Sequence, residues 1–140
     1  RIPIKTIRVS VGKAGTETPT GTWTMHRAGR WQELMGPSWG QYGTHVVNGI
    51  FVHSVACGQA NSYNLPVGEY LRLGNPASHG CIRACVADAK WVWDNCNGSK
   101  IHIFDGTYTS NEALKGPLGR KALTPLRGSK NFDPTDPACK

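Results

Sequence analysis

The sequence predicts a mainly β fold in one domain, on the evidence of its turn residues, its low charge content and its length. Of 140 residues, 17 are glycine and 9 are proline, only 18% are charged, and runs of strong helix formers are few. Turns and strands should therefore predominate over helices. A chain of this length with 39% hydrophobic residues can bury a core without help from disulfides or a metal. We expect a single domain over residues 1–140.

A first strand is expected at the start of the chain, which supplies five apolar β-branched side chains: Ile2, Ile4, Ile7, Val9 and Val11. Residues 15–22 are rich in glycine, threonine and proline, and this composition predicts a turn that leads into a short strand at 23–25. Residues 27–43 carry aromatic side chains among four glycines. For this stretch we expect a long structured loop.

Residues 44–53 give the clearest hairpin pattern. Asn48-Gly49 separates two runs rich in β-branched and aromatic residues, 44–47 and 50–53. This arrangement predicts a two-residue type I′ turn, in which both turn residues take positive φ. His53 then lies at the end of a strand.

Two helices and a last strand complete the expected elements. A short helix is predicted over about 67–73 and ended by Gly74. The principal helix is predicted over about 86–95, with apolar side chains on one face and a glycine beyond its end. A strand should follow at 100–104. Residues 105–140, rich in Gly, Pro, Lys and Asn, are expected to form an extended surface tail.

The start of the chain and its net charge suggest where the protein acts and what it could bind. The sequence begins in a strand pattern without an initiator Met or a leader, so we interpret it as a processed product or an excised domain whose targeting segment has been lost. No apolar run approaches the roughly 18 to 20 residues of a membrane span. A net charge of +7 favours an anionic partner or an acidic substrate, although a solvated basic surface explains it equally well. Nucleic acid is not expected, because neither long basic runs nor recognition motifs occur.

Five cysteines are many for a reducing compartment, and they indicate an oxidising one. An odd number leaves one thiol free, and we assign that thiol to Cys81. If 86–95 is helical, Cys85 and Cys96 lie about 16 Å apart, which is too far for a disulfide. Pairings across the fold remain, with Cys139 fastening the tail, and connectivity among Cys57, Cys85, Cys96 and Cys139 stays open. Full reduction of all five is the alternative.

The segment from Ser78 to Arg83 carries the residues expected of a nucleophilic cysteine. A free thiol with a pKa near 8.5 is only slightly ionised at neutral pH, so Cys81 needs an imidazole to take its proton. His79 is near in sequence, and His53 can come near in space if the two segments are neighbours. In extended chain, His79, Cys81 and Arg83 share one face.

The neighbours of Cys81 also offer groups for the reacting oxygen. Gly80 and the Cys81 amide could donate N–H groups to an oxyanion, and Ser78 could fix the tautomer of an imidazole. A metal site is not expected, because Cys-x-x-Cys is absent and the His79–Cys81 spacing does not fit structural zinc.

Three separated motifs in this sequence resemble those of the L,D-transpeptidase (YkuD) catalytic domain. They are Ser78-His79-Gly80-Cys81-Ile82-Arg83, Val52-His53-Ser54, and the stretch from Val9 to Lys13 followed by residues 18–23, Thr-Pro-Thr-Gly-Thr-Trp. The resemblance covers about residues 7–104. It implies a β-sandwich-like domain with the cysteine beneath a lid.

The resemblance implies an enzyme whose Cys81 attacks the carbonyl of the third residue of a peptidoglycan stem tetrapeptide. The terminal D-Ala leaves, a thioester forms, and the acyl group passes to an amine of a neighbouring stem in a 3→3 cross-link, or to water. His53 becomes the base in this assignment, with His79 and Gly80 shaping the oxyanion site. Ser78 would orient an imidazole and Arg83 would position substrate.

The resemblance also implies that Ser54 contacts substrate, and Trp31 and Tyr42 could border the cleft, although aromatic packing explains them as well. It implies no metal or organic cofactor, sensitivity to carbapenems, and an extracytoplasmic cell-wall location where anionic wall polymers could be partners. One departure is the long stretch between His53 and Ser78, which could alter the acceptor. An L,D-carboxypeptidase, a transferase that anchors proteins to the wall, and a non-catalytic wall-binding module are the alternatives.

Overall fold

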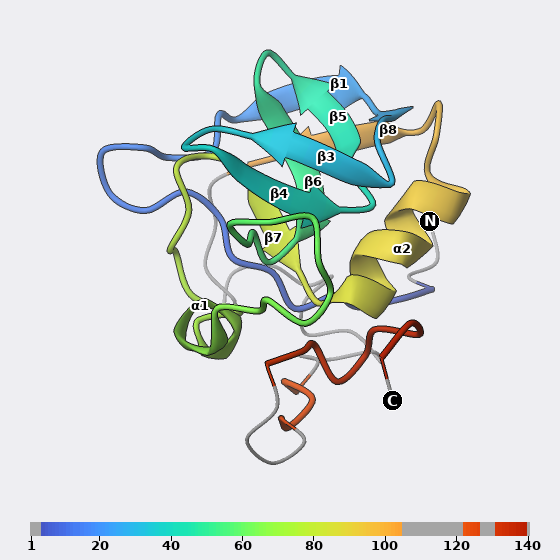
Figure 1. Cartoon of the computed structure of the whole chain (residues 1–140). Helices are drawn as coiled ribbons and strands as arrows, with labels where there is room; N and C mark the ends of the chain where they lie inside the picture. Colours follow the sequence, from blue (N-terminus) through green and yellow to red (C-terminus); the bar gives the residue numbers. More distant parts are fainter. Residues whose placement is uncertain (1–3, 105–121, 127–130, 140) are drawn as a thin grey trace.

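The computed structural model describes residues 4–104, 122–126 and 131–139 (Figure 1). Within these residues it has eight strands, arranged in one four-stranded and two two-stranded sheets, and two helices. The mainly β fold predicted from the sequence is therefore confirmed. None of the described helices is long and apolar enough to cross a membrane.

The four-stranded sheet carries His53 and Arg83, two of the residues predicted to form the active site. Its order is β2 (His26–Arg27), β5 (Thr44–Val47), β6 (Ile50–Ser54) and β7 (Ile82–Ala84). β5 and β6 are antiparallel, whereas β6 and β7 run parallel. Parallel neighbours require a crossover, and the chain between β6 and β7 supplies it with helix α1 (Val67–Leu71).

The predicted hairpin of residues 44–53 is confirmed, but its turn is not type I′. Asn48 has a φ of 49°, whereas Gly49 lies outside the left-handed region. The register shifts between His45 and Val47, so that Val47 pairs with Ile50 across the turn. This irregularity in the last pairs lets the strands close without a second residue of positive φ.

The two smaller sheets flank the central one. β1 (Gly21–Thr24) pairs with β8 (Lys100–Ile103), close to the strands expected there. β3 (Trp31–Leu34) pairs with β4 (Ser38–Gln41), so the prediction of a long loop over 27–43 is wrong. Gly36, with a φ of 115°, supplies the tight reversal between them. In Figure 1 this β3–β4 hairpin crosses in front of β6.

The strand predicted at the start of the chain is also wrong in the described residues. From Ile4 onward the chain makes only two isolated bridges there, Ser10 with Arg83 and Gly12 with Ser78. Val9 and Val11 still pack on the core, so the burial that their pattern implies is present. Ser10 bridges to β7 and Gly12 bridges to the turn before β7, so no continuous ladder of backbone hydrogen bonds forms there.

Helix α2 (Val86–Asn95) has the predicted bounds, and Gly98 follows it with a φ of 85°. Its buried residues include Val86, Ala89 and Val92, which are spaced by three. Val92 belongs to the main core, whereas Val86 and Ala89 pack with Tyr42. α1 ends at Leu71, two residues earlier than predicted, and Gly74 follows with a φ of 104°.

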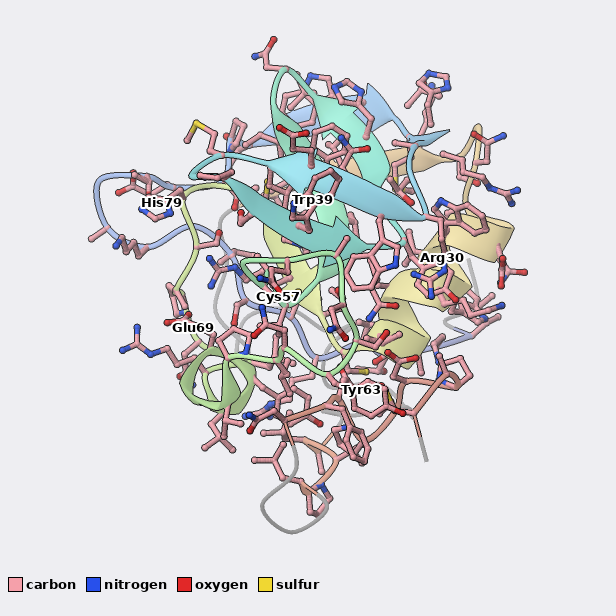
Figure 2. The ribbon with its side chains drawn as sticks, in the orientation of Figure 1. Arg30, Trp39, Cys57, Tyr63, Glu69 and His79 are labelled. Carbon is pink, nitrogen blue, oxygen red and sulfur yellow. The ribbon has the colours of Figure 1, made fainter. Side chains whose placement is uncertain are left out.

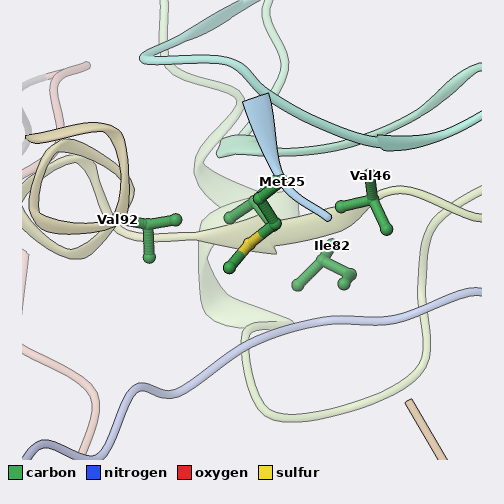
Figure 3. Packing of buried hydrophobic residues seen from close by; sticks show 5 residues of the cluster. Met25, Val46, Ile82 and Val92 are labelled. Atoms are coloured by element: carbon green, nitrogen blue, oxygen red, sulfur yellow. The ribbon is translucent and has the colours of Figure 1, made fainter. Parts of the chain in front are cut away.

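The main core lies between the central sheet and α2 (Figure 3). Its buried members are Met25, Val46, Val52, Ile82 and Val92. Full burial of one such side chain contributes roughly 1.5–3 kcal/mol. Val52 and Ile82 pair across β6 and β7, so the core fixes the two strands on which the site depends.

The described end of the chain is not the surface tail that we expected. In residues 131–139, Phe132, Asp133, Asp136 and Cys139 are buried. Asp133 accepts a hydrogen bond from the Val86 amide at the start of α2, at 2.8 Å. The segment is held inward because these carboxylates satisfy buried backbone donors. The rest of the predicted tail lies outside the described residues, except 122–126.

All five cysteines are unpaired in the structure, so the disulfides predicted across the fold are not formed. Two of the buried thiols donate hydrogen bonds instead. Cys57 donates to the Gln59 carbonyl at 3.1 Å, and Cys85 donates to Asp88 at 3.2 Å. Full reduction, the alternative left by the sequence, is the state of this structure.

Candidate active site

A cavity of about 590 Å³ opens where β6 and the start of β7 meet the β3–β4 hairpin. Five of the residues predicted to form the site line it together: His53, Ser78, His79, Cys81 and Arg83. Its other walls come from the tip of the β3–β4 hairpin and from the β5–β6 hairpin. The cavity is large enough for a small ligand or a peptide segment.

Strand pairing brings the thiol and the imidazole to one face of the sheet. His53 of β6 is the register partner of Arg83 of β7, and Cys81 lies two residues before Arg83. Because side chains alternate along a strand, Cys81 and Arg83 share the face that His53 occupies. The Phe51 amide donates to Cys81 Sγ at 3.4 Å, which ties the thiol to β6 directly.

Burial dominates the titration of Cys81. It raises the pKa of the thiol, while the Phe51 amide and the positive charge of Arg83 act in the opposite direction. Sγ also lies 3.6 Å from the Gly49 carbonyl, to which the protonated thiol donates. Cys81 is therefore a neutral thiol in this structure, and a base would have to take its proton before it could act as a nucleophile.

His53 is suited to that role. The imidazole is almost completely buried, and its pKa is lowered to about 4, mainly by desolvation and also by the Arg83 charge, against the opposing effect of the Ser54 hydrogen bond. Nδ1 is hydrogen-bonded to the Ser54 carbonyl, which can only accept. Nδ1 therefore carries the proton, and Nε2 is left with a free lone pair. At neutral pH the ring is uncharged and able to take a proton.

Gly40 of β4 lies directly against this imidazole. A Cβ added to Gly40 would be 2.7 Å from His53 Nδ1 and 2.9 Å from Cγ. Only glycine allows so close an approach of β4 to the ring. We did not identify Gly40 from the sequence, where it is one glycine among several in a presumed loop.

Ser78 has a different role from the predicted contact with an imidazole. Its Oγ donates to the Cys81 carbonyl at 2.5 Å and accepts from the Gly80 amide at 3.1 Å. The Gly80 N–H is thus engaged within the turn and is not directed at an oxyanion as we expected. Gly80 has a φ of 127°, a conformation that favours glycine. Ser78 and Gly80 shape the turn that presents Cys81.

The threonines of the N-terminal turn hold the same turn from outside. Thr18 Oγ1 donates to the Gly80 carbonyl at 2.7 Å, and Thr16 Oγ1 donates to the Ser78 carbonyl at 3.0 Å. This contact gives the threonine-rich stretch a structural purpose that its composition alone did not reveal.

Arg83 is already paired within the protein. Its Nη1 lies 2.9 Å from Glu69 Oε2, contributed by α1 in the long stretch between His53 and Ser78. Among the described residues, Arg83 Nε is buried without a hydrogen-bond partner. Glu69 is a second residue that sequence reasoning missed. His79, labelled in Figure 2, is exposed and lines the cavity, but it makes no comparable contact with the other site residues.

Three residues predicted to contact substrate do not line the cavity. Tyr42 is buried against Trp93 of α2, and Trp31 lies on the guanidinium of Arg30, which Figure 2 labels. Ser54 is buried, and its Oγ accepts from the Gln41 amide at 2.8 Å.

The aliphatic tip of the β3–β4 hairpin takes the place of those aromatic residues. Leu34 and Met35 line the cavity, and Met35 is 81% exposed. Across the described residues, no group of three or more His, Cys, Asp or Glu side chains is arranged to hold a metal ion.

Comparison with known proteins gives one family. The sequence model of the YkuD family, the L,D-transpeptidase catalytic domain, matches residues 2–116. A segment of 27 residues is 59% identical to the putative L,D-transpeptidase YciB of Bacillus subtilis. That segment spans 19% of this chain and 14% of the Bacillus protein.

Solved structures agree on the fold. An L,D-transpeptidase from Mycobacterium tuberculosis is 23% identical, with a TM-score of 0.56 over 71% of this chain. One from Mycobacterium smegmatis is 22% identical, with a TM-score of 0.53 over 73% of this chain. The alignments cover 42% and 49% of those two proteins, so the present chain corresponds to less than half of each.

Proposed function

Because the chain belongs to the family of L,D-transpeptidase catalytic domains, we propose that it is a cysteine acyltransferase that forms 3→3 cross-links between peptidoglycan stem peptides. The observation that carries this proposal is that Cys81 and His53 line the same cavity from the same face of the sheet. The His53 tautomer leaves Nε2 free to accept the thiol proton.

The first half-reaction is the acylation of Cys81. Nε2 of His53 takes the thiol proton as Sγ attacks the carbonyl carbon of the third stem residue. The carbonyl oxygen becomes an oxyanion, which we assign to the Cys81 amide because Ser78 occupies the Gly80 amide. The tetrahedral intermediate collapses, the C–N bond breaks, and His53 returns the proton to the departing D-Ala amine.

The second half-reaction reverses these roles. The amine of a neighbouring stem attacks the thioester carbonyl, and His53 accepts the proton that this amine loses. The C–S bond then breaks, and the Cys81 thiolate recovers a proton from the imidazolium. If water attacks in place of the amine, the product is a trimmed tripeptide, and the enzyme is an L,D-carboxypeptidase.

The electrostatics of the site favour this neutral pair over a preformed thiolate and imidazolium. Burial raises the pKa of Cys81 and lowers that of His53, so both groups are uncharged at pH 7. Arg83 stabilises the thiolate as it develops, because its charge lowers the pKa of Cys81. The charge separation therefore arises only when substrate is present.

The proposed substrate sets the location and the inhibitors. Peptidoglycan lies outside the cytoplasm, so we place the enzyme there, where its net charge of +7 also suits anionic wall polymers. Related structures have been solved with imipenem and with a faropenem-derived adduct. We propose that carbapenems acylate Cys81 in the same way that the donor stem does.

Mass spectrometry of the protein with a stem tetrapeptide tests the proposal. We expect a covalent adduct on Cys81, release of D-Ala, and a cross-linked dimer when an acceptor stem is added. A trimmed tripeptide alone would identify a carboxypeptidase, and binding without turnover would identify a wall-binding module. Cys81→Ala should abolish the adduct, while Cys96→Ala, at the end of α2, should retain it. An active Cys81→Ala variant would overturn the mechanism.

A further inference from the structure

The described C-terminal residues 131–139, here called the C-terminal clamp, lie beyond the 2–116 match to the family. In Figure 1 the clamp runs across the underside of the molecule, next to the first turn of α2. Two of its carboxylates, Asp133 and Asp136, are almost completely buried. Buried carboxylates are costly unless they are hydrogen-bonded, so their partners indicate what the clamp does.

Asp133 joins the clamp to the nucleophile side of the site. Its Oδ2 accepts from the Val86 amide at 2.8 Å, and neighbouring Thr135 accepts from the Ala87 amide at 3.0 Å. These are orphan donors at the N-terminus of α2. α2 begins two residues after β7, the strand that follows Cys81.

Asp136 joins the clamp to the base side. Its Oδ2 accepts from Gln41 Nε2 at 3.0 Å, in a buried contact between residues 95 positions apart. The backbone N–H of Gln41 donates to Ser54 Oγ at 2.8 Å. The Ser54 carbonyl is the group that fixes Nδ1 of His53. Three hydrogen bonds, joined through the covalent structure of Gln41 and Ser54, therefore connect Asp136 to the imidazole.

We propose that the C-terminal clamp is a positioning element of the active site, and that Asp136 and Gln41 are positioning residues that hold the base in register with the nucleophile. Asp136 sets the Gln41 side chain, and β4 carries that constraint to both Ser54 and the ring beside Gly40. The inference rests on the proposed function, since it assumes that His53 serves Cys81.

Gln41 is held at both ends, which makes a small displacement of β4 unfavourable. Its Oε1 accepts from Arg30 Nη1 at 2.8 Å, while its Nε2 donates to Asp136. Loss of either partner leaves a buried amide group unsatisfied. Displacement of a catalytic group by about 1 Å can cost about 100-fold in rate.

A reciprocal exchange tests the Asp136–Gln41 contact. Gln41→Glu places a second carboxylate against Asp136, and we expect kcat for acylation of Cys81 to fall about tenfold or more with little change in KM. Adding Asp136→Asn to that variant restores a donor facing an acceptor, and kcat should recover to within about threefold of the wild type. Asp94→Asn, on the exposed part of α2, is the matched control.

A second pair of variants serves if Gln41→Glu does not fold. Gln41→Ala and Asp136→Ala should each lower kcat, and the double variant should be no slower than the slower single one, because both remove the same contact. A wild-type kcat in Gln41→Glu, or no recovery on adding Asp136→Asn, would overturn the proposal. So would purely additive losses in the alanine pair.

Alkylation of Cys81 by iodoacetamide separates this inference from the proposed function. If the wild type fails to release D-Ala, the proposed substrate is wrong, yet the alkylation rate of Cys81 still reports on His53. We expect that rate to fall in Gln41→Glu and to recover in the exchanged double variant. A purely structural role would lower the unfolding temperature and leave the rate per folded molecule unchanged.

Discussion

Substitution of Gly40 by alanine should impair the base without touching the nucleophile. The new Cβ would lie 2.7 Å from His53 Nδ1, about 0.7 Å inside the 3.4 Å at which contacts become ordinary. His53 is 1% exposed, so the ring is closely surrounded except where it borders the cavity. Either the ring or β4 must move by several tenths of an ångström, and the bond from Nδ1 to the Ser54 carbonyl weakens.

Two magnitudes follow from that clash. Overpacking of a dense interior costs about 1–3 kcal/mol, which should appear as a lower free energy of unfolding in urea. A base displaced by roughly two thirds of an ångström should slow acylation of Cys81 by about 10- to 100-fold. The loss should fall on kcat, because Gly40 is not among the residues that line the cavity.

The assay is the rate of adduct formation on Cys81 with a stem tetrapeptide, followed by mass spectrometry at several substrate concentrations. Gly68→Ala is the matched control, since a Cβ at Gly68 meets nothing within 4 Å and the residue lies inside α1. That control should keep full activity and gain slightly in stability. A Gly40→Ala enzyme with wild-type kcat would refute the argument that β4 seats the imidazole.

Three further predictions concern other groups of the site. Because burial keeps His53 neutral, its contribution to the free energy of unfolding is complete above about pH 6.5 and is lost as the pH falls to about 4. Urea unfolding should show that this free energy falls by about 3 kcal/mol over that range. His53→Gln should largely abolish the pH dependence. A pH dependence identical in both proteins would contradict this. Iodoacetamide should label native Cys81 before the partly buried Cys96 and the three buried cysteines, and faster labelling of Cys96, mapped by mass, would show that His53 does not activate the thiol. Ser78→Ala should lower the free energy of unfolding by about 1–3 kcal/mol, because two buried backbone partners lose their bonds, and an unchanged urea midpoint would exclude this role.

Local patterns predicted the elements that depend on local chemistry. The helix over 86–95 was predicted with its observed bounds, because apolar spacing and a following glycine are properties of one segment. The hairpin around Asn48 was predicted for the same reason. The turn type was wrong because it depends on how β5 and β6 pair near the turn, which no dipeptide encodes.

The errors lie where distant segments decide the structure. The chain near Val9 is apolar and buried, yet its hydrogen bonds are divided between β7 and the Ser78 turn, so it is not a strand. A loop was predicted over residues 27–43 because glycines and aromatic residues obscured the two short strands within it. Gly40 and Glu69 could not be recognised, since their importance comes from His53 and Arg83, which only the fold brings to them.

The segment from Ser78 to Arg83 therefore specifies less of the chemistry than its density of functional groups indicates. The polar groups of Ser78 and Gly80 form hydrogen bonds within the turn itself, and His79 is exposed beside the cavity. The proposed base, His53, lies on β6, and the backbone carbonyl of Ser54 fixes its tautomer. The local motif thus presents the thiol, while the sheet supplies the base, so a variant that preserves the motif but shifts β4 or β6 should lose acylation.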